Sequence, residues 1–153
     1  MRFINLRGRD TARTPMQWDD SENAGFTTGT PWIKVNPNYK EINAADQMAD
    51  PDSVFHYYKK LIALRKQEDV IVYGDYQLLA PESETLYAYT RTLEREDGTD
   101  ELLVICSFAG QEETFEIPEK FLDGEILIGN GRRESVERRF TLAPYEAIAI
   151  LKR

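Results

Sequence analysis

A series of short apolar runs separated by turn residues fills the second half of the chain, and it constrains the fold more than any other feature. Apolar and polar residues alternate in Leu86–Arg91, and Leu102–Phe108 is a continuous apolar run. Asp97-Gly98, between these two runs, is a strong hairpin-turn signal. The other runs are 70–73, 76–79, 113–117, 125–128, 138–142 and 145–151, with turn residues at Gly74-Asp75, Pro118, Gly124, Gly129–Gly131 and Pro144. Seven or eight short strands at this spacing predict a mainly β fold, an antiparallel sandwich of Greek-key type.

Residues 51–67 predict one helix ahead of the strands. Asp50 can cap its N-terminus, and Pro51 suits the first helical turn. Apolar side chains follow helical spacing from Val54 to Ile62. Arg65 and Lys66 place positive charge in the last turns, where the helix dipole favours cations.

Residues 1–50 show neither a helical nor a strand period. They are rich in Pro, Gly, Asn and Thr, and they carry the large aromatics Trp18, Phe26, Trp32 and Tyr39. Such a long irregular segment is uncommon in a self-sufficient domain, and aromatic side chains of this size must bury against something. Either a further part of the protein covers them, or they fold back onto the β domain.

Composition excludes several classes of function. The chain has 19 basic and 27 acidic residues, for a net charge of −8, which argues against a nucleic-acid or anionic-membrane partner. No apolar run approaches the roughly 20 residues of a membrane span. The opening Met1–Leu6 is too short for the core of a signal peptide, and we expect a cytoplasmic protein.

The single cysteine and single histidine limit the chemistry further. Cys106 lies in an apolar run, where a buried small side chain is expected, and it has no cysteine with which to form a disulfide. His56 is predicted to be structural, and with Cys106 alone it cannot assemble a metal site. We therefore expect neither a metal nor a cofactor.

The densest group of charged residues is Arg9–Asp20, which packs two arginines, three aspartates, a proline and a tryptophan into a segment typical of a loop. It resembles the loop near the end of the catalytic barrel in α-glucosidases of the α-amylase superfamily. The resemblance continues through Asn23–Gly29, Pro31-Trp32, Val35–Tyr39 and Phe55–Lys66. Thr11 departs from the asparagine expected there, which leaves any side-chain amide contact in doubt.

The resemblance implies that the chain is the C-terminal part of a glycoside hydrolase. Residues 1–67 would be the remnant of a (β/α)8 barrel, with its active-site loop and last helix, and residues 68–153 the C-terminal β-sandwich. Retaining hydrolysis needs two carboxyl groups about 5–5.5 Å apart. By resemblance, the aspartate nucleophile, the glutamate acid/base and a further aspartate lie on barrel strands upstream of Arg9. No catalytic residue is therefore nominated here, and the chain alone is expected to be inactive.

Two arginines are the predicted substrate-binding residues. By resemblance, Arg13 reaches into the glucose pocket and pairs with a barrel aspartate, although it could instead clamp only its own loop. A guanidinium suits the first role because its rigid fork can fix a carboxylate and donate to sugar hydroxyls. Arg9 would line the pocket rim or shape the loop. Gln17, Trp18 and Asp19 would wedge the loop onto the barrel.

Several functions stay open at this stage. The parent implied by the resemblance is a retaining, exo-acting α-glucosidase whose partner is an oligosaccharide with α-1,6 or related bonds. A trehalose-6-phosphate hydrolase or a sucrose-isomerising enzyme would share the same loop. A non-catalytic module that binds glucan or stabilises the barrel is the alternative. Four tyrosines could form its glucan platform, although we favour their placement on the two faces of the sandwich: Tyr73, Tyr76, Tyr87 and Tyr89.

Overall fold

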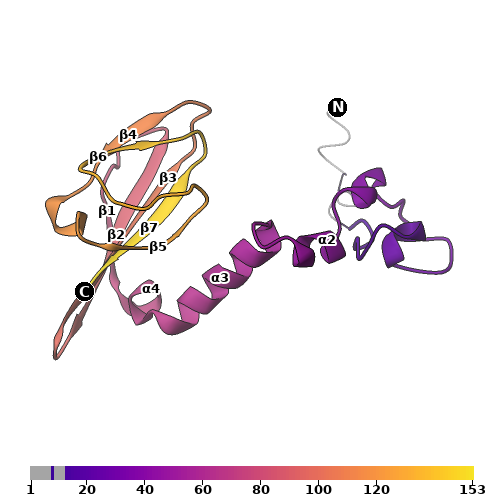
Figure 1. Cartoon of the computed structure of the whole chain (residues 1–153), viewed down its shortest axis with the longest axis horizontal. Coiled ribbons are helices and arrows are strands. Elements are labelled where there is room, and N and C mark those ends of the chain that lie inside the picture. The colour runs from indigo at the N-terminus through magenta and orange to yellow at the C-terminus, as the bar shows by residue number, and fades with distance from the viewer. Residues whose placement is uncertain (1–7, 9–12) are drawn as a thin grey trace. The chain divides into compact units, whose positions relative to one another are not determined.

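The computed structural model describes residue 8 and residues 13–153, and the chain divides between Lys59 and Lys60 into two compact units. Within the described residues, the unit that begins at residue 60 contains all the strands, and the other contains loops and short helices. Figure 1 labels the helices and strands along the chain.

The second unit is an antiparallel β-sandwich, as the sequence predicts. Its larger sheet has the strand order β1-β2-β3-β7-β5, and β4 pairs with β6 in a separate short sheet (Figure 1). The strands are β1 (Asp75–Leu78), β2 (Leu86–Arg95), β3 (Gly98–Ser107), β4 (Glu113–Glu116), β5 (Glu125–Gly129), β6 (Arg139–Leu142) and β7 (Ala147–Lys152). Because β3 pairs with both its hairpin partner β2 and the distant β7, the chain makes a long-range closure rather than a simple meander.

The hydrophobic core lies between the two sheets. The larger sheet contributes Ala88, Leu103, Ile105, Ile148 and Ile150, and the other side contributes Ile117, Phe121, Phe140 and Leu142. Phe121 belongs to the short 3-10 helix η4 (Glu119–Phe121) and is fully buried. Burial of a side chain of this size stabilises a fold by roughly 1.5–3 kcal/mol. Because alternate residues of β2 face this core, its alternation was visible in the sequence.

A one-turn helix, α4 (Asp69–Tyr73), stands where the sequence predicted a strand. That prediction was wrong because contacts distant in sequence outweigh the strand preference of Val, Ile and Tyr. Val70 is buried against β3 and β7. The Arg91 guanidinium donates to the carbonyls of Val70 (3.1 Å), Val72 (3.3 Å) and Gly74 (2.7 Å). The Val70 carbonyl also accepts from the Gly74 amide at 3.2 Å, whereas Val72 and Gly74 lie at the helix end, where carbonyls lack intrahelical partners.

The first unit contains the 3-10 helices η2 (Glu22–Gly25) and η3 (Pro37–Lys40) and the helix α2 (Ala44–Ala49), which the sequence did not predict. The Asn43 side chain caps α2 by accepting from the Asp46 amide at 2.9 Å. The carbonyls of Gln17 and Trp18 accept from the first two amides of α2, each at 2.9 Å. Since these partners lie far away in sequence, no local periodicity announced the helix.

The predicted helix is α3 (Val54–Gln67), which begins three residues later than the expected start at 51. Asp50 accepts from the Asp52 amide at 2.9 Å in the preceding turn, so it organises that turn rather than capping α3. No residue of α3 is buried. Because short helices in proteins are stabilised mainly by packing an apolar face, this exposure marks a helix without its packing surface. In the described part of the chain, no helix is long and apolar enough to cross a membrane.

Candidate functional site

Arg13 is the predicted substrate-binding residue that the structure describes. Its side chain is exposed, and it has no hydrogen-bond or ion-pair partner among the described residues. Pro15, two residues further on, is buried. Arg9, the other predicted substrate-binding residue, lies outside the described residues, as does Thr11. The structure thus presents one guanidinium at the start of a loop, and none of the described residues occupies its donors.

The loop after Arg13 contains a left-handed turn of three consecutive residues. Asn23, Ala24 and Gly25 have φ values of 54°, 58° and 65°. Left-handed backbone costs a residue with a Cβ about 1–2 kcal/mol, so neighbouring contacts must hold it. The Trp18 amide donates to the Ala24 carbonyl at 2.9 Å, and the Ala24 side chain is completely buried.

Asp19 explains why glycine is needed at position 25. A Cβ on Gly25 would lie 2.7 Å from either oxygen of the Asp19 carboxylate. That carboxylate accepts from the Ser21 hydroxyl and from the Ser21 amide (2.9 Å), and these bonds lower the Asp19 pKa. The Asn23 side-chain amide donates to the carbonyls of Thr27 (3.3 Å) and Gly29 (3.2 Å). The loop therefore holds one shape through its own polar groups.

Large apolar side chains of the first unit face outward instead of forming a core. Trp32 is 89% exposed and Trp18 is 53% exposed. Others in this unit are also exposed: Met16, Phe26, Ile42, Met48, Val54, Phe55 and Tyr58. The loop backbone is anchored to α2. Of the three side chains predicted to wedge the loop against a barrel, Trp18 is exposed, whereas Gln17 and Asp19 are partly buried: Gln17 donates to the Ile42 carbonyl and Asp19 accepts from Ser21.

His56 makes structural contacts. Its Nε2 lies 3.0 Å from the Met48 carbonyl, and its ring meets Phe55 edge-on at 5.2 Å. Among the described residues, no three His, Cys, Asp or Glu side chains gather in a way that could hold a metal ion.

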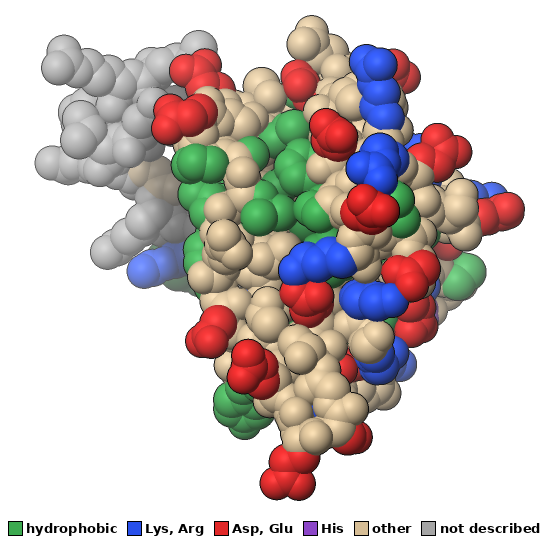
Figure 2. Space-filling model, turned by 90° about the vertical axis from the view of Figure 1, so that its left-hand side faces the viewer, with side chains coloured by type: hydrophobic (Ala, Val, Ile, Leu, Met, Phe, Trp, Pro, Cys, Tyr) green, Lys and Arg blue, Asp and Glu red, His purple; other side chains and the backbone are tan. Residues whose placement is uncertain are grey.

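Several carboxylates of the sandwich form ion pairs, such as Asp100 with Arg95, Asp123 with Lys152 and Glu146 with Arg133. Figure 2 shows acidic and basic side chains interspersed on one face, around a group of hydrophobic ones. A catalytic proton donor requires a raised carboxyl pKa. In the described residues, the carboxyls with a clear departure from the ordinary pKa are Asp19, Asp123 and Glu146, and all three are lowered by hydrogen bonds from neighbours. These three are therefore poor proton donors.

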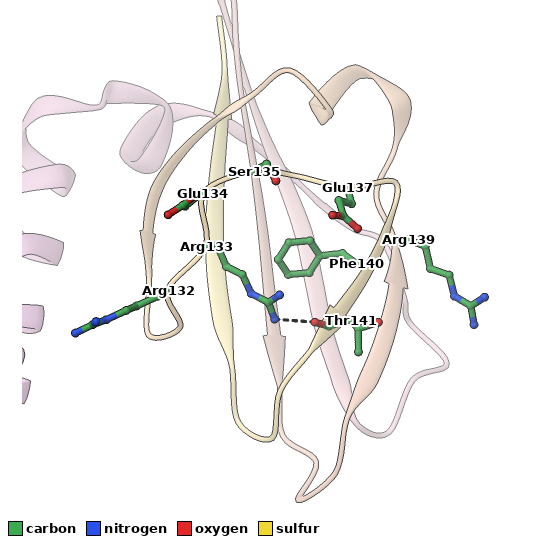
Figure 3. Close-up of a pocket in the computed structure, with 8 residues that line it drawn as sticks. All are labelled: Arg132, Arg133, Glu134, Ser135, Glu137, Arg139, Phe140 and Thr141. Atoms are coloured by element: carbon green, nitrogen blue, oxygen red, sulfur yellow. Dashed lines mark hydrogen bonds between the residues drawn. The ribbon is translucent and has the colours of Figure 1, made fainter.

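A polar pocket of about 280 Å³ in the sandwich was not predicted from the sequence. Arg133 lies between it and Glu146, whose side chain is only 4% exposed. Two guanidinium–carboxylate bonds join them, Nε to Oε1 at 2.7 Å and Nη2 to Oε2 at 2.6 Å. Arg133 also donates to the Thr141 carbonyl at 2.8 Å and stacks on the Phe140 ring (Figure 3).

Arg133 and Glu146 brace the segment before β6 against the turn before β7. The Ala143 amide donates to Glu146 at 2.7 Å, and with Arg133 it lowers the pKa of this carboxyl. The other two arginines of the pocket, Arg132 and Arg139, point away from it in Figure 3. Because Glu146 neutralises the Arg133 charge inside the protein, we interpret the pocket as structural. In the sequence, the one feature that could have indicated this ion pair is a glutamate directly before the apolar run of β7.

Of the four tyrosines considered as a glucan platform, Tyr76, Tyr87 and Tyr89 lie together on one face of the larger sheet, whereas we expected the tyrosines to be divided between two faces. Tyr76 and Tyr87 each lie within 5.4 Å of the Tyr89 ring, measured between centroids. The hydroxyls of Tyr76 and Tyr87 are 3.1 Å apart. Tyr73 belongs to α4 and is exposed. The expectation failed because it treated β1 and β2 separately, whereas their register places Tyr76 opposite Arg91, on the side of Tyr87 and Tyr89.

Comparisons with known proteins give a consistent picture. Residues 1–74 match the family described as the catalytic domain of α-amylase. The chain is 53% identical to an oligo-1,6-glucosidase of Parageobacillus thermoglucosidasius, over 96% of this chain and 26% of that protein. It is 41% identical to a trehalose-6-phosphate hydrolase of Bacillus subtilis, over 95% of this chain and 26% of that protein.

Solved structures agree. A trehalose-6-phosphate hydrolase from Bacillus licheniformis matches with a TM-score of 0.86 and 44% identity, over 98% of this chain and 27% of that one. An isomaltulose synthase from Klebsiella sp. LX3 matches with a TM-score of 0.84 and 39% identity, over 94% of this chain and 26% of that one. The chain thus spans about a quarter of the length of these relatives. It belongs to the α-amylase family.

Proposed function

We propose that this chain is the C-terminal part of a retaining, exo-acting α-glucosidase that hydrolyses α-1,6 or related bonds of short oligosaccharides. The observation that carries the proposal is the 53% identity to an oligo-1,6-glucosidase, maintained over 96% of the chain. Residues 1–67 would complete the catalytic barrel, and residues 68–153 would form the C-terminal domain. The parent enzyme would work in the cytoplasm.

The exposed apolar side chains of the first unit support this proposal. A soluble monomer rarely exposes large contiguous apolar patches, and such patches mark surfaces that bind another partner. Here they include Trp18 and Trp32 on loops and Tyr58 on α3. The remainder of a barrel would bury them.

Arg13 would be this chain's contribution to the sugar pocket. It would pair with an aspartate of the barrel and close the end of the pocket that receives the terminal glucose. Its lack of a partner among the described residues suits this role. The braced turn at Asn23–Gly25 would hold the loop that carries it. The two catalytic carboxyls would come from the barrel, so the chain alone would be inactive.

A chimera tests the role of Arg13. In it, this chain replaces the matching segment of the Parageobacillus oligo-1,6-glucosidase, and glucose release from isomaltose is measured. Truncating one partner of a buried charge pair costs about 2–5 kcal/mol, so Arg13→Ala should lower kcat/KM by roughly 30- to 5000-fold. Arg139→Ala, which removes an exposed arginine of β6, is the matched control and should leave kcat/KM unchanged. An unchanged kcat/KM for Arg13→Ala would remove Arg13 from the site.

The solved structures support two other candidate parent enzymes, a trehalose-6-phosphate hydrolase and a sucrose-isomerising enzyme. The trehalose-6-phosphate hydrolase and the isomaltulose synthase match with TM-scores of 0.86 and 0.84. A parent of either kind would use the same arginine loop on a different substrate. Assaying the chimera cannot decide between them, because the rest of the barrel contacts the second sugar. Purification of the natural full-length enzyme and comparison of isomaltose, trehalose 6-phosphate and sucrose would decide.

The non-catalytic alternative is a glucan-binding module. The tyrosine group on the larger sheet is the observation that favours it. Affinity electrophoresis of the 153-residue chain on dextran separates the two: retardation supports glucan binding, and unchanged mobility supports a structural role.

A further inference from the structure

The turn after β5 contains the chain's single Asn-Gly dipeptide, Asn130-Gly131. An asparagine followed by glycine is chemically labile, because a glycine without a Cβ lets its backbone nitrogen approach the asparagine side chain closely. Every other asparagine of the chain precedes a residue with a Cβ. Both residues of the dipeptide are exposed, so water reaches them.

The fold requires the glycine of this dipeptide. A Cβ on Gly131 would overlap Oε1 of Glu146 and lie 2.9 Å from its Cδ. That carboxylate cannot move aside without loss, because it is 4% exposed and is bonded to Arg133 and to the Ala143 amide. A larger residue at position 131 would therefore displace a buried ion pair.

The fold also uses the asparagine, as a bridge from the end of β5 to the start of β7. The Asn130 Nδ2 donates to the Tyr145 carbonyl, and its Oδ1 accepts from the Ala147 amide, each at 2.8 Å. Tyr145 has a left-handed backbone with φ of 58°, a conformation that a residue with a Cβ keeps only when its neighbours hold it. Asn130 is one of the groups that hold it.

We propose that Asn130 is a site of spontaneous deamidation, which the folded sandwich keeps closed and which opens with the Arg133–Glu146 ion pair. In the reaction, the Gly131 backbone nitrogen bonds to Asn130 Cγ. The proton of that nitrogen passes to the side-chain nitrogen, which leaves as ammonia. Water then adds to one carbonyl of the succinimide ring, which opens to aspartate or isoaspartate. Water is the only co-reactant, and nothing is oxidised or reduced.

The folded turn slows the first step by holding the Asn130 side chain. Two backbone groups of another segment bind its amide, so the side chain is not free to rotate onto the Gly131 nitrogen. The attack therefore needs a local opening in which both bonds break. Glu146 controls this opening, because its carboxylate lies against Gly131 and its backbone joins Tyr145 to Ala147.

The product is damaging because it removes the bridge. At neutral pH an aspartate side chain only accepts hydrogen bonds, so it has no donor for the Tyr145 carbonyl. Isoaspartate lengthens the backbone before Gly131 by one methylene and displaces the turn. A brief opening of the turn is thus converted into a permanent loss of stability.

Deamidation of the 153-residue chain is followed on the Asn130 peptide by mass spectrometry, in buffer and in guanidinium chloride at the same mildly alkaline pH. We expect the folded chain to deamidate at least about tenfold more slowly than the unfolded chain, because only molecules with an open turn react. Asn130→Gln should nearly abolish the mass gain, which assigns it to this side chain. Equal rates in the two solvents would overturn the proposal.

Two substitutions test the control by the ion pair. In buffer, Arg133→Met should speed deamidation at least about fivefold, because the turn opens more often. Arg139→Met removes an exposed arginine of β6 and should leave the rate unchanged. If circular dichroism shows that Arg133→Met does not fold, Glu146→Gln replaces it, with a smaller acceleration. An ion-pair variant that deamidates no faster than Arg139→Met contradicts this control.

The consequence of the reaction is tested separately. Asn130→Asp reproduces the aspartate product and should unfold at a lower urea concentration than wild type, because the Tyr145 carbonyl has lost its donor. A midpoint equal to that of wild type would show that deamidation does not damage the turn.

Discussion

Arg133 is predicted to matter more for the stability of the sandwich than any exposed ion pair. Replacing it by methionine removes two bonds to Glu146, one to the Thr141 carbonyl and a stacking contact with Phe140. Glu146, 4% exposed, would keep only the Ala143 amide as a donor. Breaking a fully buried pair costs about 3–5 kcal/mol. Since the Arg133 side chain is 34% exposed and the pocket admits water, we expect about 2–3 kcal/mol for Arg133→Met.

Replacing the partner of Arg133, Glu146, by glutamine should cost less stability. Glu146→Gln keeps an oxygen that can accept from the Ala143 amide, and it leaves an arginine that can turn towards solvent. We expect about 1–2 kcal/mol. Urea unfolding followed by far-UV circular dichroism measures both, because the two tryptophans, Trp18 and Trp32, lie in the first unit and do not report on the sandwich.

The pH dependence has a definite sign. Hydrogen bonds from Arg133 and Ala143 lower the Glu146 pKa in the folded state. The stability that this carboxylate contributes is present above its unfolded pKa and is lost as the pH falls through the folded value. The unfolding free energies of wild type and Glu146→Gln should therefore approach each other as the pH is lowered from 7.

A loss of unfolding free energy below about 1 kcal/mol for Arg133→Met at pH 7, where the buried pair is charged, would refute the reasoning.

Three further outcomes are expected. In the chimera, Gly25→Ala should lower kcat/KM about tenfold, because a Cβ would clash with the Asp19 carboxylate and the left-handed backbone costs ~1–2 kcal/mol. The control Gly29→Ala should have little effect, because the nearest atom to its Cβ is Thr27 Oγ1 at 3.8 Å. Arg91→Met should destabilise the sandwich by about 2 kcal/mol in urea unfolding, since three carbonyls at α4 lose a donor, and a stability equal to wild type would contradict this. In limited proteolysis of the 153-residue chain, residues 14–40 should be cut first and residues 69–153 should resist; uniform resistance would contradict an unpartnered first unit.

The sandwich could be predicted from the sequence because its strands alternate locally and its turns use residues with known preferences. Seven of the eight predicted runs became β1 to β7. The hairpin turn predicted at Asp97-Gly98 forms at Glu96-Asp97, because Gly98 already pairs with Arg95 as the first residue of β3. Local patterns failed where distant residues decide the structure. Val70–Tyr73 forms a helix because Arg91 binds its carbonyls, and α2 forms where Gln17 and Trp18 complete its N-terminus.

The candidate site was readable only through family resemblance. A lone exposed arginine such as Arg13 has no local signature of sugar binding, because its proposed partner would lie outside this chain. The Asn23–Gly25 turn was visible as a motif, but its left-handed backbone follows from contacts with Trp18 and Asp19. The Arg133–Glu146 pair joins residues 13 positions apart and depends on the β6–β7 turn, so spacing alone did not reveal it.

Glucose release from isomaltose by two purified proteins tests the central claim most directly. The 153-residue chain should release none, because the attacking carboxylate and the proton donor are proposed to lie on the barrel. The chimera with the Parageobacillus barrel should release glucose at a rate that depends on Arg13. Hydrolysis of isomaltose by the 153-residue chain alone would contradict the account.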